Sequence, residues 1–570
     1  MPETAENETL GVLLEQHTDD VRDASYVMSP AVLGAARLTR FSFSRSVLRR
    51  ADANGWKVAL SHLDLDDRGQ GEAAYRVEAE GHVFHFVAFL QELAEQAHTD
   101  RVIAERWEIV AALIEGELTR ERWDHLRVNV PEQERGRLDH DVLSLTRGNR
   151  SVRFFDYLID ELAAGRQPDP DHVGDAGYIM RSTAFYGNGK YGMRSYGGYP
   201  AGHPLAAPYR AQFIAAWCFR ELSYDVIEEC ARLRGGESAV PFGGEWRTFF
   251  GLGNATGLGL VPYMFKHPRI VNGWVAVREL ALAKVRNEPG TPASAAALDR
   301  WIERARQHFV TGTDTPADPF LCPAELVPVV DAIRGAWEKT RGDALPFDSL
   351  MRWAMTQGAE TSELVASLLV ELDDTPDDVV DNLLHVNEHT QVDLSISAAA
   401  ALDLIADRFG WIDDLGLDSD SARSFWWVYS DNTEEPRRTR RGRLDVGQQD
   451  FAIDVVNHMF DLRAALRDEP ESSLSAVLAD HPHLIDAAGR LFVSDQPYGE
   501  PRDNPAAETY LPLQVQRFQL AMYGMDNFKP KSTDWLRVTL FQGAPRISDL
   551  EHGLTDDWVL PPMPQAQEIS

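Results

Sequence analysis

Residues 56–90, WKVALSHLDLDDRGQGEAAYRVEAEGHVFHFVAFL, decide the fold of the first part of the chain. Apolar and polar residues alternate along 56–66, 73–80 and 82–90, and this period of two is typical of β-strands. The loop DDRGQG separates the first two segments, and Glu80-Gly81 makes the next turn. Such short connections join antiparallel strands, because a parallel pair needs a long crossover. The stretch therefore predicts an antiparallel sheet of three or more strands.

Helical periodicity, with apolar residues three and four apart, dominates the rest of the chain. It predicts helices at 101–115, 151–165, 209–234, 270–285, several between 297 and 410, then 450–467, 472–490 and 512–524. The segment SFWWVY at 424–429 predicts one further strand. We therefore expect a mainly α protein with a small N-terminal antiparallel β-sheet, an α+β fold.

Linkers divide the chain into several expected domains. GRQPDPD follows a predicted helix that ends at Gly165, and EPGTPASAA occupies 288–296. Both stretches are rich in residues that interrupt helices and strands. We expect a peripheral segment at 1–30, an α+β domain at 31–170, a central helical domain at 171–290 and a mainly helical domain at 297–570.

Composition excludes several classes of protein. The 570 residues carry a formal net charge of −33 and are 44% apolar, which is typical of a globular protein but would repel nucleic acid and anionic membranes. The three cysteines, Cys218, Cys230 and Cys322, form no CxxC pair, so we expect neither a disulfide framework nor a cysteine-rich zinc site. Cys218 and Cys230 fall in a helical pattern and are expected to be buried, inert thiols.

The expected compartment is the cytoplasm. The N-terminus is acidic and lacks the basic-then-apolar pattern of a signal peptide. No apolar run approaches the roughly 18 to 20 residues that cross a bilayer. Homo-oligomerisation is left open.

The stretch at 178–210, YIMRSTAFYGNGKYGMRSYGGYPAGHPLAAPYR, is the expected functional centre. Glycines let a ligand approach the backbone, and successive N–H groups form an anion-binding nest. Arginines grip carboxylates or phosphates with paired hydrogen bonds, and a lysine beside them can act as a base. We expect Lys190, Tyr186 and Tyr191 to be catalytic and these residues to bind substrate: Arg181, Asn188, Arg194, Tyr196 and Arg210. A structural loop that pairs with carboxylates is the alternative.

The segment at 251–269, GLGNATGLGLVPYMFKHPR, adds Asn254, Tyr263 and His267 to the expected pocket. Its glycines resemble a loose dinucleotide-binding pattern, but that site requires a strand before the first glycine. EWRTFF, which precedes it, does not look like a strand. Close packing of helices through small residues is therefore the favoured interpretation.

An arginine-rich segment follows at 429–443, YSDNTEEPRRTRRGR. Such a run is usually a solvated loop that neutralises itself. The functional alternative is a lid that closes over an anion. We therefore add Arg437 and Arg438 to the expected substrate-binding residues.

A zinc site is a separate hypothesis. His385, Glu388 and His389 form HxxEH in a predicted helix, and these five residues resemble the inverted zinc motif of pitrilysin-type metallopeptidases. Two histidines four residues apart share one helix face and suit zinc. Two surface histidines are the alternative.

These patterns favour an enzyme that acts on a small anionic metabolite, a carboxylate or a phosphate, by proton transfer or elimination. A lyase-type reaction is favoured, and the cofactor is unknown. The alternatives are a zinc hydrolase that uses the HxxEH helix and a non-catalytic ligand-binding or scaffold protein.

Overall fold

The computed structural model describes residues 20–93, 107–132, 139, 141–174, 177–187, 202–205, 210–254, 268–311, 323–373, 393–414, 425–429, 436–440, 451–492, 498, 512–532, 535–552 and 558–564. Helices occupy more of these residues than strands do, as the sequence predicts. None of the described helices is long and apolar enough to pass through a lipid bilayer.

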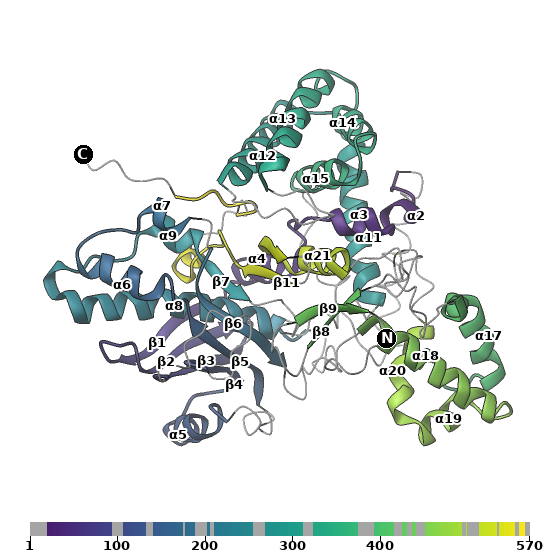
Figure 1. Ribbon diagram of the computed structural model, residues 1–570, viewed down its shortest axis with the longest axis horizontal. Helices are drawn as coiled ribbons and strands as arrows, with labels where there is room; N and C mark the ends of the chain where they lie inside the picture. Colours follow the sequence, from purple (N-terminus) through teal and green to yellow (C-terminus); the bar gives the residue numbers. More distant parts are fainter. Residues whose placement is uncertain are drawn as a thin grey trace.

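A nine-stranded sheet forms the centre of the described structure (Figure 1). In spatial order its strands are β1 (Lys57–Leu65), β2 (Gly71–Ala79), β3 (His82–Leu90), β4 (Ile109–Glu115), β5 (Val142–Arg150), β6 (Tyr178–Gly187), β7 (Gly251–Asn254), β11 (Trp535–Leu540) and β10 (Met525–Ser532). Neighbours are antiparallel except β6 and β7, which are parallel. The predicted small N-terminal sheet is wrong, because this sheet is large and takes strands from the centre and the end of the chain.

The first three strands lie where the alternating pattern predicts them, but the helix predicted at 101–115 is wrong over 109–115. Those residues form β4, and both faces of that strand are covered. Ala111 and Leu113 face the main hydrophobic core, whereas Val110 and Ala112 face a second, smaller core. A strand buried on both faces loses the alternation of polar and apolar residues, so its sequence resembles that of a buried helix.

Helices cover both faces of the sheet. On one face, α8 (Arg210–Gly235) crosses β5, β6 and β7 and supplies much of the main core. The opposite face carries α5 (Arg120–Asn129), whose Trp123 and Leu126 belong to the smaller core. The sheet is thus the middle layer of three.

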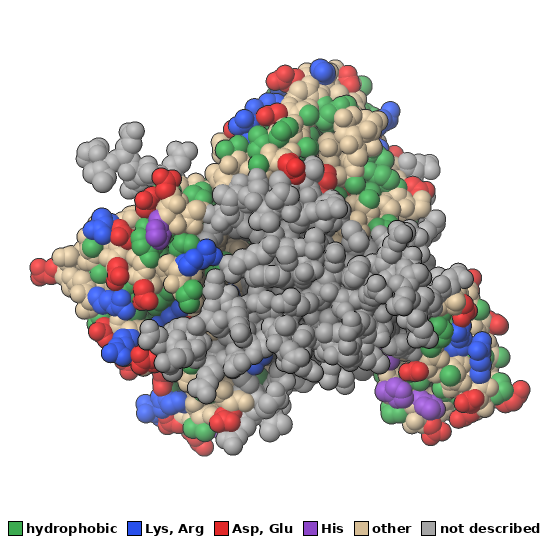
Figure 2. All heavy atoms as spheres, in the orientation of Figure 1, with side chains coloured by type: hydrophobic (Ala, Val, Ile, Leu, Met, Phe, Trp, Pro, Cys, Tyr) green, Lys and Arg blue, Asp and Glu red, His purple; other side chains and the backbone are tan. Residues whose placement is uncertain are grey.

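Further helices extend the main core into an upper lobe (Figure 1). The α-helices of this core and its margins are α2 (Ala24–Val27), α3 (Pro30–Ala35), α4 (Phe43–Ala53), α6 (Phe155–Ala163), α7 (Pro170–Val173), α9 (Gly244–Phe249), α11 (Pro268–Arg286), α12 (Pro292–Thr311), α13 (Pro323–Thr340), α14 (Pro346–Met355), α15 (Ala359–Val370) and α21 (Pro512–Tyr523). In Figure 2, acidic and basic side chains are interspersed over the described surface of α12 to α15.

A second group of helices has a hydrophobic core of its own. It contains α17 (Ala398–Phe409), α18 (Phe451–Asp468), α19 (Leu474–Asp480) and α20 (Ile485–Leu491). The two-stranded ribbon of β8 (Phe425–Tyr429) and β9 (Pro436–Arg440) lies between this group and the large sheet in Figure 1. The strand predicted at 424–429 is confirmed, and the division into domains stays a prediction. Short 3-10 helices are η4 (Gly236–Ser238), η5 (Gly410–Asp414), η6 (Pro482–Leu484) and η7 (Ile547–His552).

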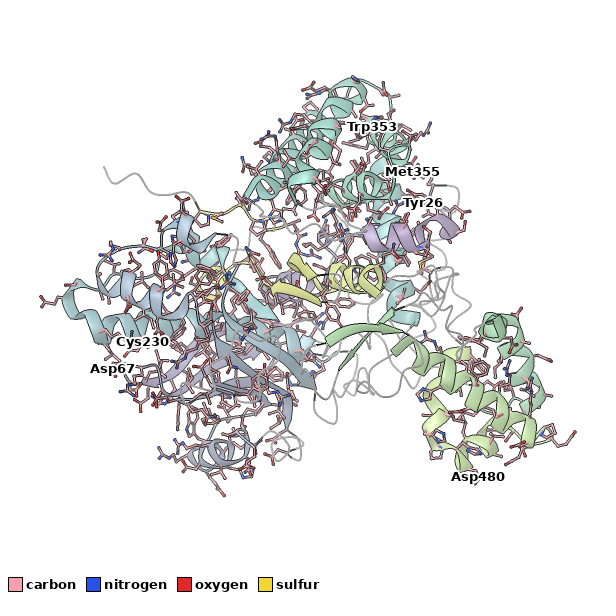
Figure 3. All side chains as sticks on the ribbon, in the orientation of Figure 1. Tyr26, Asp67, Cys230, Trp353, Met355 and Asp480 are labelled. Carbon is pink, nitrogen blue, oxygen red and sulfur yellow. The ribbon has the colours of Figure 1, made fainter. Side chains whose placement is uncertain are left out.

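Two cysteines behave as predicted. Cys218 and Cys230 of α8 are buried, and Cys322 lies outside the described residues. Burial raises the pKa of both thiols, that of Cys230 to about 11. Figure 3 shows Cys230 near Asp67, close to the loop that joins β1 and β2. Thiols that stay protonated at neutral pH are poor nucleophiles.

A buried ionic cluster fastens the N-terminal segment to the helical lobe. Arg22 donates two hydrogen bonds to the Glu279 carboxylate of α11, at 2.8 and 2.6 Å, and also bonds to Glu363 of α15. Arg278 pairs with Glu363 at 2.7 Å. All four side chains are almost completely buried. Two arginines therefore balance two glutamates where water cannot screen them.

Removing one member of this cluster leaves a buried charge without its partner. We expect Arg22→Ala to lower the free energy of unfolding by about 3–5 kcal/mol. The matched control is Arg68→Ala. Arg68 pairs with Glu92 on the solvent-exposed surface, so this ion pair should contribute less than about 1 kcal/mol to the free energy of unfolding. Urea denaturation of both variants measures the difference, and equal losses would contradict the role of the cluster.

Candidate functional site

The three segments chosen from the sequence begin on elements that lie side by side. β6 carries Arg181, and its parallel neighbour β7 ends at Asn254. Arg181 lies opposite Gly253, and Ser182 lies opposite Asn254. β9, which holds Arg437 and Arg438, contacts β11, the other neighbour of β7. The structure thus brings described parts of the three segments onto neighbouring strands.

Only some of the expected site residues fall within the described part of the chain. The side chains of Arg181 and Arg210 are described, and both are buried. For Tyr186, Asn254, Arg437 and Arg438 the structure places the strand but not the side chain. The remaining candidates lie outside the described residues: Asn188, Lys190, Tyr191, Arg194, Tyr196, Tyr263, His267, and the zinc candidates His385, Glu388 and His389. Their roles stay predictions.

Two glycines of the dinucleotide-like pattern allow close packing within the sheet. A side chain at Gly251 would meet the carbonyl oxygen of Leu540 at 2.5 Å, and one at Gly253 would meet the ring of Tyr178 at 2.5 Å. These glycines therefore let neighbouring strands and a ring approach closely. The predicted packing role is right in kind, but the partners are strands rather than helices. The residues before them form α9, so no strand precedes the first glycine.

The ends of these strands define one end of the sheet, which we call the β6/β7 end. Gly187 closes β6 opposite Ser144 of β5, and Asn254 closes β7 in the same direction. α8 and α9 connect the two strands. In such strand–helix–strand units, ligands bind beyond the carboxyl ends of the parallel strands.

The first turn of α8 lies at the β6/β7 end. Arg210, the first residue of this helix, donates a hydrogen bond to the carbonyl oxygen of Pro204 at 2.8 Å. That contact ties residues 202–205 to the start of the helix. The backbone N–H groups of a helix N-terminus carry partial positive charge and favour anions.

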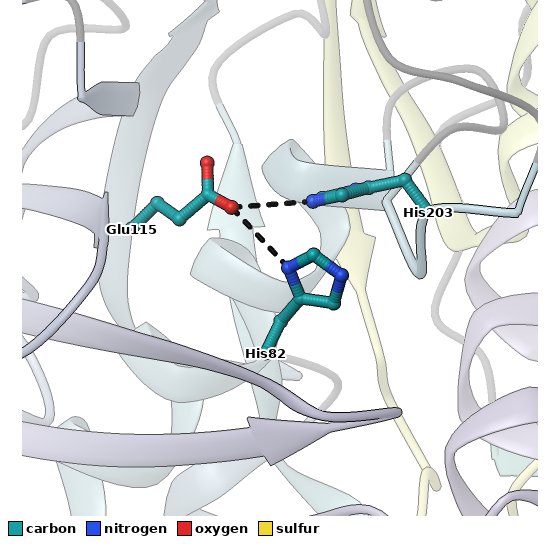
Figure 4. Close-up of side chains that lie close together, drawn as sticks. All are labelled: His82, Glu115 and His203. Carbon is teal, nitrogen blue, oxygen red and sulfur yellow. Dashed lines mark hydrogen bonds and ion pairs between the residues drawn. The ribbon is translucent and has the colours of Figure 1, made fainter.

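Two histidines and one glutamate meet at the same end of the sheet (Figure 4). His82 begins β3, Glu115 ends β4, and the register places Phe84 opposite Glu115. Nδ1 of His82 lies 3.4 Å from Oε1 of Glu115, and Nε2 of His203 lies 3.3 Å from the same oxygen. The two imidazole centroids are 4.3 Å apart. His203 is buried at 5% exposure, whereas His82 is 38% exposed.

A strained turn positions His82. Glu80 and Gly81 have φ values of +51° and +86°, as a two-residue hairpin turn requires. Glu80 is an unusual residue at positive φ. Its carboxylate accepts hydrogen bonds from Arg50 at 2.9 and 2.8 Å and from the indole of Trp56 at 3.1 Å. These contacts offset the strain and hold the start of β3 in place.

The backbone N–H of Leu205 determines which tautomer a neutral His203 adopts. The N–H of Leu205 donates to Nδ1 of His203 at 3.1 Å. A neutral His203 therefore carries its proton on Nε2, which faces Glu115. A metal at Nε2 would move that proton to Nδ1 and break this bond. Losing one hydrogen bond and burying its donor costs about 1–3 kcal/mol, whereas zinc coordination is worth about 10 kcal/mol or more. A metal could therefore still bind.

Sequence reasoning missed this cluster. Glu115 is separated from His82 by 33 residues and from His203 by 88 residues. No local spacing therefore connects the three. His82 reads as the start of a strand, and Glu115 reads as the end of a helix. The one usable signal is that His203 falls within the glycine- and tyrosine-rich stretch.

Buried polar side chains of α8 hold the backbone next to β7 in place. The fully buried Arg220 of α8 donates to five backbone carbonyls, those of Arg247, Thr248, Phe250, Ala544 and Pro545. Glu221 beside it accepts from Arg220 at 3.1 Å and from the N–H of Ile547 at 3.4 Å. Burial raises the pKa of Glu221 to about 7, although the charge of Arg220 opposes the shift.

A groove of about 980 Å³ lies on the other face of the sheet, beside α5. Four of its charged side chains form two ion pairs. Arg127 binds Glu72, and Arg76 binds Glu117 at 2.6 and 3.0 Å. Both arginines named here are thus already paired with carboxylates, so the β6/β7 end is the stronger candidate site for an anion.

Comparisons with protein-family models, with curated proteins and with solved structures found no match to this chain. The residues of the site are therefore the guide to what the protein does, because a fold alone does not determine function.

Glu221 makes stability depend on pH. Its pKa is about 7 in the folded protein and ordinary in the unfolded chain, so the folded state binds the extra proton. The contribution is fully present below about pH 4.5 and is lost as the pH rises through about 7. We expect Glu221→Gln to stabilise the protein above pH 7 by about 1–3 kcal/mol and to leave it unchanged near pH 4.5. Thermal unfolding across this range measures the effect, and a gain that does not vary with pH would contradict it.

Proposed function

We propose that this protein is an enzyme that acts on a small anionic metabolite, a carboxylate or a phosphate, at the β6/β7 end of the sheet. The observation that carries the proposal is the parallel pairing of β6 with β7. β7 stops at Asn254, opposite Ser182, and β6 runs on to Gly187, so both glycine-rich segments continue toward the same end of the sheet. Ligand sites commonly lie beyond the carboxyl ends of such strands.

Positive charge at this end supports an anionic ligand. Arg210 begins α8 at this end, whereas Arg181 lies within β6 opposite Gly253, near the end of β7, and both side chains are buried. The N-terminus of a helix of 26 residues adds the partial positive charge of the N–H groups of its first turn. A guanidinium within a partly dry site binds a carboxylate or phosphate more strongly than one in water.

Proton transfer is the chemistry that the residues of these segments suit best. In an elimination, a base removes the proton beside the carboxylate, the electron pair forms a double bond, and an acid protonates the leaving group. Lys190 would be the base, with Tyr186 or Tyr191 as the acid. Arg181, Arg194 and Arg210 would stabilise the charge that develops on the carboxylate.

The other candidates would orient the substrate. Asn188 and Tyr196 extend the first segment. The remaining polar side chains belong to the neighbouring segments: Asn254, Tyr263, His267, Arg437 and Arg438. The second proposal is that this site binds its ligand without converting it. Such a binding protein would use the same arginines and would differ only in lacking a group that transfers a proton.

A screen of anionic metabolites by thermal shift tests the proposal. We expect at least one carboxylate or phosphate to raise the melting temperature of the parent protein. Arg194→Ala should weaken the binding of that ligand by about 10- to 100-fold, because a charged hydrogen bond contributes about 1.5–3 kcal/mol. Lys190→Ala should bind the ligand but lose turnover by about 10²- to 10⁴-fold.

The matched control is Arg68→Ala, since Arg68 lies in the loop at the opposite end of the sheet. It should bind and react like the parent. If Arg194→Ala and Lys190→Ala also behave like the parent with every ligand, the site lies elsewhere. If ligands bind but none is converted, the binding protein without turnover is correct.

A further inference from the structure

We infer that His82, Glu115 and His203 form a zinc site at the β6/β7 end, with Nδ1, Oε1 and Nε2 as the respective ligand atoms. The three ligand atoms lie within 4.8 Å of one another. Two imidazoles and one carboxylate are a ligand set typical of catalytic zinc. The inference does not rest on the proposed function, because zinc can bind whether or not an anionic metabolite is found.

Two of the three separations between ligand atoms fit tetrahedral coordination, and the third, between the two imidazoles, is within 4.8 Å. Zinc bonds of about 2.0–2.1 Å at tetrahedral angles place neighbouring ligand atoms about 3.3–3.4 Å apart. The two distances from Glu115 Oε1 are 3.4 Å to His82 and 3.3 Å to His203. Both exceed the common N–H···O distance of about 2.9–3.0 Å. Octahedral Mg²⁺, with bonds of about 2.0–2.1 Å, would need ligands only about 3.0 Å apart, so the spacing favours zinc over Mg²⁺.

Rigid backbone holds two of the ligands. His82 and Glu115 lie on adjacent strands, and the N–H of Gly116 donates to the carbonyl oxygen of Val83 at 2.8 Å. His85, on the same strand as His82, contacts the carbonyl oxygen of Gly116 at 3.0 Å. The two strand ends are therefore fixed relative to each other. A site on paired strands needs little rearrangement when a metal binds.

The third ligand is held separately. His203 belongs to residues 202–205, which Arg210 ties to the start of α8 through the carbonyl oxygen of Pro204. The hydrogen bond from Leu205 opposes metal binding, but one such bond is weaker than metal coordination. Among the described residues three can serve as ligands, and a site with three protein ligands keeps its fourth tetrahedral position for water or substrate, as catalytic zinc does.

A competing interpretation is a carboxylate that accepts a hydrogen bond from each imidazole without any metal. Both interpretations use the same three residues. They differ in whether the purified protein holds an ion, and this difference can be measured without knowing the reaction.

The test uses full-length protein that is stripped with EDTA and then titrated with Zn²⁺ against a chromophoric chelator. Bound zinc is counted by mass spectrometry of the digested protein. We expect one equivalent with a dissociation constant below about 1 µM. His82→Ala and Glu115→Gln should each weaken binding by at least about 100-fold. His82 is partly exposed, so its loss should leave the fold intact, and circular dichroism checks this.

Two further variants locate the ion. His62→Ala removes an exposed histidine from β1 and should bind zinc like the parent. The double variant His385→Ala/His389→Ala removes the HxxEH histidines and should also bind like the parent. Replacing Zn²⁺ with Co²⁺ should give the strong visible absorption of tetrahedral cobalt in the parent and lose it in His82→Ala.

Three results would overturn the inference. The first is a parent protein that binds zinc no more tightly than about 10 µM. The second is that His82→Ala and Glu115→Gln retain the zinc content of the parent. The third is that the HxxEH double variant loses zinc while the His82 variant keeps it, which would assign the metal to that helix.

Discussion

The buried guanidinium of Arg220 joins two stretches of the chain that are nearly 300 residues apart. Its acceptors are the carbonyl oxygens of two stretches. Arg247, Thr248 and Phe250 precede β7, and Ala544 and Pro545 follow β11. A buried cation is tolerated only where its donors are satisfied, so the carbonyls and the guanidinium hold one another in place. Because β7 pairs with both β6 and β11, the second half of the sheet depends on this contact, and so does the arrangement of the β6/β7 end.

How much of the fold the sequence predicts depends on how local each signal is. β1, β2 and β3 follow from alternation and short turns, since hairpin partners are adjacent in the chain. β4 is missed because both of its faces are buried, and β6 is missed because its tyrosines and glycines read as a loop. β10 and β11 come from the far end of the chain and join the sheet only through β7. No local pattern indicates which distant strand will complete an edge.

The candidate site divides in the same way. Arg181 and Arg210 stand out by composition, because cations among glycines in an acidic chain are unusual, and the structure buries both. The cluster of His82, Glu115 and His203 gives no such signal. Each of these residues looks ordinary in its own segment, and only the register of β3 with β4 and the placement of α8 bring them together.

An acidic protein can still hold an anion, because charge acts over a limited range. At physiological salt, exposed charges farther apart than about 8 Å are largely screened. The net charge of −33 therefore acts mainly on long polyanions, whose phosphates run across the whole surface. A small metabolite at the β6/β7 end would respond instead to the groups within a few ångströms: arginines, the start of α8 and, where zinc binds, a dication. Burial strengthens each of those contacts while the distant carboxylates stay screened. A charge distribution that would repel nucleic acid would thus still allow a compact anion to bind at one end of the sheet.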